Sequence, residues 1–242
     1  MIRQSFLIAL QFLTRIPLRC EWSPQAAGRS LLFYPLVGLL IGLLLAAVAA
    51  LLSGGNLVAM ALVVTLWVLL TGGLHLDGLA DSADAWAGGY GDRQRTLAIM
   101  KDPYAGPIGV ISIVLVLGLK WSALADLMAE ARWLPLVLAP VLGRLAVLAL
   151  FYTTPYARAE GLGAALAAHL PRQAAAQVML LVTALIVLVG GGVGIWMLLT
   201  ALAVLVAMRA LLMRRIGGTT GDTAGALVEL VEAAVLASCA LV

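Results

Sequence analysis

Three aspartates stand at a spacing that would let them act together. Asp77, Asp81 and Asp84 occupy positions i, i+4 and i+7 of one segment. At about 3.6 residues per turn, this spacing places the three carboxylates along one face of a helix. Like charges at such spacing destabilise a helix by about 0.2–0.5 kcal/mol per pair. A cation is therefore expected among them.

Magnesium suits this arrangement because it prefers hard oxygen ligands. It takes one or two carboxylates and completes its shell with water and phosphate oxygens. We therefore predict a Mg²⁺ site on Asp77, Asp81 and Asp84, where the metal would neutralise a diphosphate and stabilise its leaving oxygen. The alternative is a solvated acidic helix end. The gathering of three of only twelve acidic residues on one face favours the metal.

His75 lies just before the acidic face. It precedes Asp77 by two positions, so in a continuous helix it points away from the carboxylates. A turn through Gly72 and Gly73 would redirect it. Its role is either that of a general base or phosphate contact, or that of an interfacial histidine, and both readings stay open.

A mixed-charge segment follows the acidic helix. Arg93, Arg95 and Lys101 lie close enough in sequence to the predicted metal site to bind phosphate, and Asp102 ends the segment. The same basic residues also suit the topology of a membrane protein without any ligand.

A second polar cluster lies near the C-terminus. Arg214, Thr220 and Asp222 precede the last apolar stretch, and Glu229 and Glu232 lie within it. Thr220 and Asp222 sit where residues that cap a helix would stand. The glutamates have no such explanation, because a carboxylate deep in a membrane costs on the order of 2–3 kcal/mol. Such residues usually face a polar cavity.

Arg144 complements the two glutamates. It lies inside another apolar stretch, where an arginine demands a carboxylate or phosphate partner. We predict that it pairs with Glu229 or Glu232.

The composition shows which elements must position these residues. Of the 242 residues, 63% are hydrophobic and 11% charged, and the mean hydropathy is +1.08. This leaves too little polar surface for a soluble globule, so the fold class expected is an all-α, polytopic integral membrane bundle forming a single transmembrane domain over residues 1–242. The net charge of +3 is explained by basic residues in the loops on one side of the membrane, so no nucleic-acid partner is expected. Membrane lipid is the expected surrounding.

About seven transmembrane helices are expected, joined by short connections. They are predicted at Leu31–Leu52, Leu57–Leu74, Gly106–Ala125, Leu134–Tyr152, Ala174–Val189, Ile195–Met213 and Ala224–Leu241. Glycine-rich turns at 53–56 and 190–194 should each join an antiparallel hairpin. Gly38 and Gly42 form a GxxxG pattern that indicates close helix packing. Residues 1–30 are expected to lie at the interface.

The basic residues define the orientation, since Lys and Arg accumulate in short cytoplasmic loops. Lys120 and Arg132 fall on one side of the membrane. The other side receives twelve basic residues: Arg3, Arg15, Arg19, Arg29, Arg93, Arg95, Lys101, Arg158, Arg172, Arg209, Arg214 and Arg215. This predicts a cytoplasmic N-terminus in a bacterial inner membrane. The motif segments 75–105 and 214–223 would both face the cytoplasm.

Several motifs together resemble the cobalamin synthase, or adenosylcobinamide-GDP ribazoletransferase, family. They occur in order along nearly the whole chain: Thr14-Arg15-Ile16-Pro17, Tyr34-Pro35-Leu36-Val37-Gly38, Gly73-Leu74-His75-Leu76-Asp77-Gly78-Leu79-Ala80-Asp81, Met100-Lys101-Asp102, Gly106 with Gly109, and Gly217-Gly218-Thr219-Thr220-Gly221-Asp222. One departure is Pro103-Tyr104, where members of the family often carry Ser and Arg.

The resemblance implies a reaction in which α-ribazole, or its 5′-phosphate, displaces GMP from adenosylcobinamide-GDP. Magnesium would bridge the diphosphate, since phosphoryl transfer depends mainly on positioning and charge neutralisation. Asp81, His75 and Asp102 would serve catalysis, with a carboxylate or His75 taking the proton of the attacking ribose hydroxyl. Substrate contacts are predicted for a wider polar set: Arg15, Arg93, Arg95, Lys101, Arg144, Arg214, Thr220, Asp222, Glu229 and Glu232. A homo-oligomer is compatible with the sequence.

Two other functions would use some of the same residues. A CDP-alcohol phosphotransferase also uses membrane aspartates and magnesium, but its Ala-Arg pair after Asp-Gly is missing after Gly78. A transporter would use Glu229, Glu232 and Arg144 as an intramembrane relay between repeated halves, and no repeat is evident.

Overall fold

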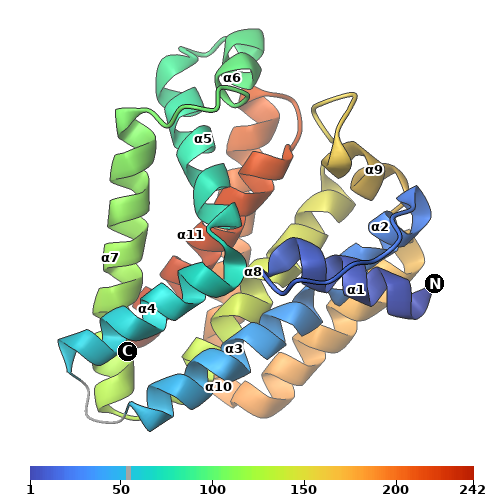
Figure 1. The fold of residues 1–242 in the computed structure, drawn as a ribbon. Helices are drawn as coiled ribbons and strands as arrows, with labels where there is room; N and C mark the ends of the chain where they lie inside the picture. The colour runs from blue at the N-terminus through green and yellow to red at the C-terminus, as the bar shows by residue number, and fades with distance from the viewer. Residues whose placement is uncertain (53–55) are drawn as a thin grey trace.

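The chain folds into helices joined by short loops. The computed structural model describes residues 1–52 and 56–242, so the turn predicted at 53–56 lies largely outside the described residues. The helices are α1 (Ile2–Leu13), α2 (Pro24–Ser30), η1 (Leu31–Phe33), α3 (Tyr34–Leu51), α4 (Leu57–Thr71), α5 (Leu74–Gly88), α6 (Arg93–Ile99), α7 (Pro107–Ala129), α8 (Trp133–Thr153), α9 (Leu162–Ala168), α10 (Arg172–Arg215) and α11 (Gly221–Ala240) (Figure 1).

Within the described residues, five helical segments are long and apolar enough to cross a membrane. They are Pro24–Leu51, Pro107–Ala129, Trp133–Thr153, Arg172–Arg215 and Gly221–Ala240. The pair α4 and α5 passes the same test together, although it is bent by 88°. These segments confirm a multi-pass helical membrane protein.

Helix α10 contains two membrane spans. It has 44 residues, about twice what one crossing needs, and its backbone is non-helical at Gly191, where φ is 51°. A Cβ atom on Gly194 would collide with the carbonyl of Ile186, although an unbroken helix would separate these residues by roughly 12 Å. The chain therefore reverses at the glycines, as the sequence predicts. With the two arms separate and α4–α5 taken as one bent span, the described helices agree with about seven spans.

Two glycines produce the bend between α4 and α5. Gly72 and Gly73 have φ values of 64° and 71°, a region that disfavours other residues. Their N–H groups donate to the carbonyls of Leu69 and Val68 at 3.3 and 3.1 Å, which ends α4. The chain leaves in a new direction, and α5 runs alongside α7 and α11 (Figure 1). This turn is what carries the aspartates to the other helices.

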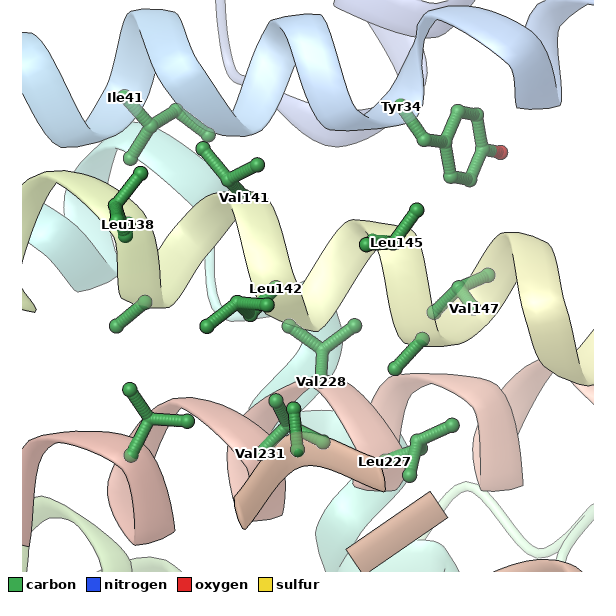
Figure 2. Packing of buried hydrophobic residues seen from close by; sticks show 14 of the residues in the cluster. Tyr34, Ile41, Leu138, Val141, Leu142, Leu145, Val147, Leu227, Val228 and Val231 are labelled. Carbon is green, nitrogen blue, oxygen red and sulfur yellow. The ribbon is translucent and has the colours of Figure 1, made fainter. Parts of the chain in front are cut away.

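Helix α8 forms the centre of the bundle, between α3 and α11. Figure 2 shows Ile41 of α3 and Val228 of α11 packed on opposite sides of α8. A Cβ on Gly38 would collide with the carbonyl of Pro140, and one on Gly42 with the carbonyl of Val137. The GxxxG pattern therefore serves close helix packing, as predicted.

Replacing Gly42 with leucine should separate α3 from α8. Overpacking of this kind costs about 1–3 kcal/mol, so Gly42→Leu should lower the thermal unfolding midpoint in detergent, followed by circular dichroism. Gly118→Leu is the matched control, because nothing lies within 4 Å of a Cβ built there. Equal midpoints for the two variants would refute close packing at Gly42.

Candidate active site

The acidic face of α5 is held by contacts from two other helices. Asp84 accepts hydrogen bonds from the N–H groups of Gly106, at 2.6 Å, and Gly109, at 2.9 Å. Its carboxylate thus caps the N-terminus of α7, where the helix dipole favours a negative charge. Asp84 fixes α5 against α7, and each of its oxygens already accepts one N–H.

Helix α11 brings a fourth carboxylate to this face. A Cβ on Gly78 would lie 2.6 Å from the carbonyl oxygen of Asp222, so the two backbones touch. The charges of Asp77, Asp84 and Asp222 all act on Asp81. We call these four aspartates the carboxylate cluster. The two motifs that stand far apart in the sequence thus form one site.

The carboxylate cluster carries an excess of negative charge. Among the described residues it has one ion pair, from Arg158 Nη2 to Asp222 Oδ2 at 2.8 Å. The described residues contain no group of three His, Cys, Asp or Glu side chains arranged to hold a metal. The Mg²⁺ site on Asp77, Asp81 and Asp84 therefore stays a prediction, and Asp84 already accepts two N–H groups. The surplus charge and the oxygen donors suit a hard divalent cation.

Two loops at the cluster are joined by their backbones. The N–H of Ala157 donates to the Thr219 carbonyl at 2.8 Å, and the N–H of Thr219 donates to the Pro155 carbonyl at 2.9 Å. Arg93 braces both loops, since its Nε and Nη2 donate to the carbonyls of Ile216 and Ala157 at 2.8 and 3.2 Å. The structure therefore places Arg93 on backbone carbonyls, not in the cavity where a phosphate contact was predicted.

A cavity of about 260 Å³ opens beside the cluster. Asp77, Asp222 and Arg158 are at least partly exposed and line its mouth, whereas the buried His75 and Arg144 line it farther in. Gly72 and Gly73 have redirected His75 into the bundle, where it is 4% exposed. The cavity thus joins members of both motifs to the mid-span arginine.

Tyr156 lines the same cavity from the loop after α8. Burial raises the pKa of its phenol above the ordinary value, while a hydrogen bond from the Gly221 backbone and the Arg158 charge oppose the rise and the Asp222 charge adds to it. Its hydroxyl therefore stays protonated and can donate a hydrogen bond at neutral pH.

Four charged side chains neutralise one another inside the bundle. Arg144 pairs with Glu232, and Lys120 Nζ lies 2.7 Å from Glu229 Oε2 and 2.6 Å from Glu232 Oε2. Arg144 Nη2 also lies 3.4 Å from His75 Nδ1. The predicted pairing of Arg144 with a glutamate is thus confirmed, and two cations offset two carboxylates.

Two expectations about these residues need correction. Lys120 was assigned to the side opposite the motifs, but it is 3% exposed within α7 and its Nζ lies 4.4 Å from the Trp67 ring centroid. Glu229 and Glu232 were predicted to contact substrate, but they are buried and do not line the cavity. Their partners, not a ligand, explain why carboxylates are tolerated in the membrane.

Other predicted site residues lie away from the cavity. The N–H of Arg15 donates to the Leu70 carbonyl at 2.8 Å, and Arg95 stacks over Tyr90 at 5.0 Å. Arg214 is exposed at the end of α10. The structure gives these three arginines no place in the cavity.

The remaining predicted residues have local partners or lie at the surface. Thr220 is buried and caps α11, reciprocally with Thr223. Asp102 Oδ1 accepts the Tyr104 N–H at 3.1 Å in an exposed turn. Lys101 is exposed in a surface hollow shared with Arg158. None of the three lines the cavity.

The sequence did not indicate the cavity residues Tyr156 and Glu160, a role for Tyr34 beyond its place in the family motif, or a role for Arg158 beyond topology. The signal available was the polar loop after α8, which faces the same side as the aspartates. Its closeness to Asp222 depends on pairing with the loop before α11, which no local pattern shows.

The chain is similar to proteins of one family over nearly its whole length. Residues 5–240 match the family model described as cobalamin-5-phosphate synthase. A Pseudomonas fluorescens protein named adenosylcobinamide-GDP ribazoletransferase is 57% identical, and one of the same name from Pseudomonas entomophila is 58% identical; each match covers 98% of both chains. No solved structure matches. The chain belongs to the cobalamin-5-phosphate synthase family.

Proposed function

We propose that the chain is a membrane-embedded transferase that joins α-ribazole, or its 5′-phosphate, to adenosylcobinamide-GDP and releases GMP. The names of its relatives support this reaction. The observation that carries it in the structure is that Asp77 and Asp222, from two distant motifs, line the mouth of one cavity. Carboxylates and one arginine at a cavity mouth suit a magnesium-bound diphosphate.

The reaction needs one bond made and one broken. A ribose hydroxyl attacks the phosphorus attached to the cobinamide arm, the new P–O bond forms, and the P–O bond to GMP breaks. The hydroxyl proton passes to Asp222, the carboxylate at the cavity mouth that is not assigned to the metal. His75 is better suited to donate, because its Nδ1 faces the Arg144 guanidinium and so acts as the acceptor, leaving the proton on Nε2.

Asp77 and Asp81 would hold magnesium, with Asp222 close by. The metal would neutralise the diphosphate and the charge that develops on the departing GMP. Asp84 contributes by fixing α5 through its two N–H bonds. Arg158 holds Asp222 at the mouth.

The distribution of basic residues supports a cytoplasmic active face. Arg93, Arg158 and Arg215 surround the carboxylate cluster, whereas Arg132 lies at the far end, between α7 and α8. Since Lys120 is buried, this asymmetry is larger than the sequence suggested. An excess of positive residues on one side supports a cytoplasmic location for that side.

Loss of the Asp81 charge should abolish turnover. In purified protein with excess magnesium, Asp81→Asn is expected to lower GMP release at least about 100-fold, as expected when charge stabilisation of a transition state is removed. Asp126→Asn, the same change at an exposed position in the last turns of α7, should leave the rate within about twofold. Near-normal turnover in Asp81→Asn would contradict the assignment.

Arg93 should act on the reaction by positioning two loops. Removing a charged donor from two carbonyls costs about 1.5–3 kcal/mol per bond, so Arg93→Ala should lower kcat for GMP release about tenfold and reduce thermal stability. Arg3→Ala, at an exposed N-terminal site, is the control. A rise in KM for adenosylcobinamide-GDP with unchanged kcat and stability would indicate direct substrate binding instead.

A further inference from the structure

The cavity continues inward from its charged mouth as an apolar chamber. Its walls come from α1, α3, α8 and α9, and we define the chamber by Phe12, Leu13, Tyr34, Val147, Phe151 and Leu166. Three of these side chains are aromatic. A flat, largely apolar group fits such walls better than a phosphate does.

Two buried polar groups at this chamber have no partner among the described residues. They are the Arg144 Nε–H, on a side chain that is 0% exposed, and the Tyr34 hydroxyl, on a side chain that is 3% exposed and lies near Ser30 without a hydrogen bond of normal geometry. Because buried polar groups are nearly always hydrogen-bonded, two unpaired groups that can donate, both on cavity-lining residues, indicate a ligand with an acceptor atom.

The buried charged side chains of α7, α8 and α11 have a net charge of zero. Arg144 is offset by Glu232, and Lys120 by Glu229 and Glu232. The chamber therefore attracts no phosphate, in contrast to the mouth, where Arg158 lies and where the carboxylate cluster would hold a magnesium ion. Its occupant should be neutral.

We propose that this chamber binds the aromatic base of α-ribazole and leaves the ribose beside Asp77 and Asp222. The inference rests on the proposed function and names the part of the substrate that this end of the cavity takes. A benzimidazole is neutral, apolar on both faces, and has one free ring nitrogen that accepts a hydrogen bond. Guanine has several polar edge groups that the chamber cannot satisfy, and a corrin ring is much larger than a cavity of about 260 Å³.

The first test fills the chamber. Leu166→Trp should weaken binding of α-ribazole to the purified full-length protein at least tenfold, measured by calorimetry without the second substrate. Binding of adenosylcobinamide-GDP should change less than twofold. Leu202→Trp is the matched control, because Leu202 is 54% exposed on the outer surface of the bundle.

The second test removes a single donor. Tyr34→Phe should weaken α-ribazole binding about three- to tenfold. It should leave unchanged the binding of an indole riboside, whose base lacks the acceptor nitrogen. A structural effect of the substitution would weaken both ligands equally.

The outcomes separate this inference from the proposed function. If the wild-type protein releases GMP but Leu166→Trp and Tyr34→Phe both bind α-ribazole normally, the chamber assignment is wrong and the function stands. Weaker binding of adenosylcobinamide-GDP instead would assign the chamber to that substrate. If the wild-type protein releases no GMP from the two substrates, the proposed function itself fails. Should Leu166→Trp fail to fold, the two ligands of the Tyr34→Phe test decide.

Discussion

Mutual repulsion among four carboxylates is the constraint on which the site depends. Asp77, Asp81, Asp84 and Asp222 converge where α5 meets the N-termini of α7 and α11, and Arg158 offsets one charge. The fold keeps them together through contacts that need no metal: the bend after α4, the cap that Asp84 provides and the close approach of α5 to α11. The protein therefore holds an excess of negative charge that a divalent cation would relieve.

A second electrostatic arrangement lies deeper and has the opposite character. Lys120, Arg144, Glu229 and Glu232 join α7, α8 and α11 through ion pairs that sum to zero charge. Such pairs in a membrane mainly fix geometry, because their desolvation offsets much of their attraction. Here they orient His75 and leave the inner cavity neutral. One cavity thus has a charged mouth and an apolar interior, as a nucleoside-like substrate that reacts at its sugar requires.

Local patterns predicted the parts of the fold that local physics determines. The apolar stretches predicted the membrane spans. The glycines predicted the turn before α5 and the reversal within α10, and the helical spacing of the aspartates predicted the acidic face. The pairing of Arg144 with a glutamate was predictable, because an unpaired charge inside a membrane is costly. Roles set by tertiary contact were not predictable: the Asp84 bonds to Gly106 and Gly109, and the Arg93 bonds to two loop carbonyls. Lys120 was misplaced because a cation near a predicted span end looks like a loop residue until its partners are known.

The central claim is that the carboxylate cluster binds a divalent cation together with the diphosphate of its substrate. The most direct measurement is electron paramagnetic resonance of Mn²⁺, a spin-active substitute for Mg²⁺, titrated into the purified protein. Adding adenosylcobinamide-GDP to the protein should lower the concentration of free Mn²⁺ by more than the same amount of adenosylcobinamide-GDP does without protein. This extra binding should be lost when Asp77 and Asp81 are both replaced by asparagine. Equal Mn²⁺ binding by the two proteins, in the presence of the same substrate, would contradict the central claim.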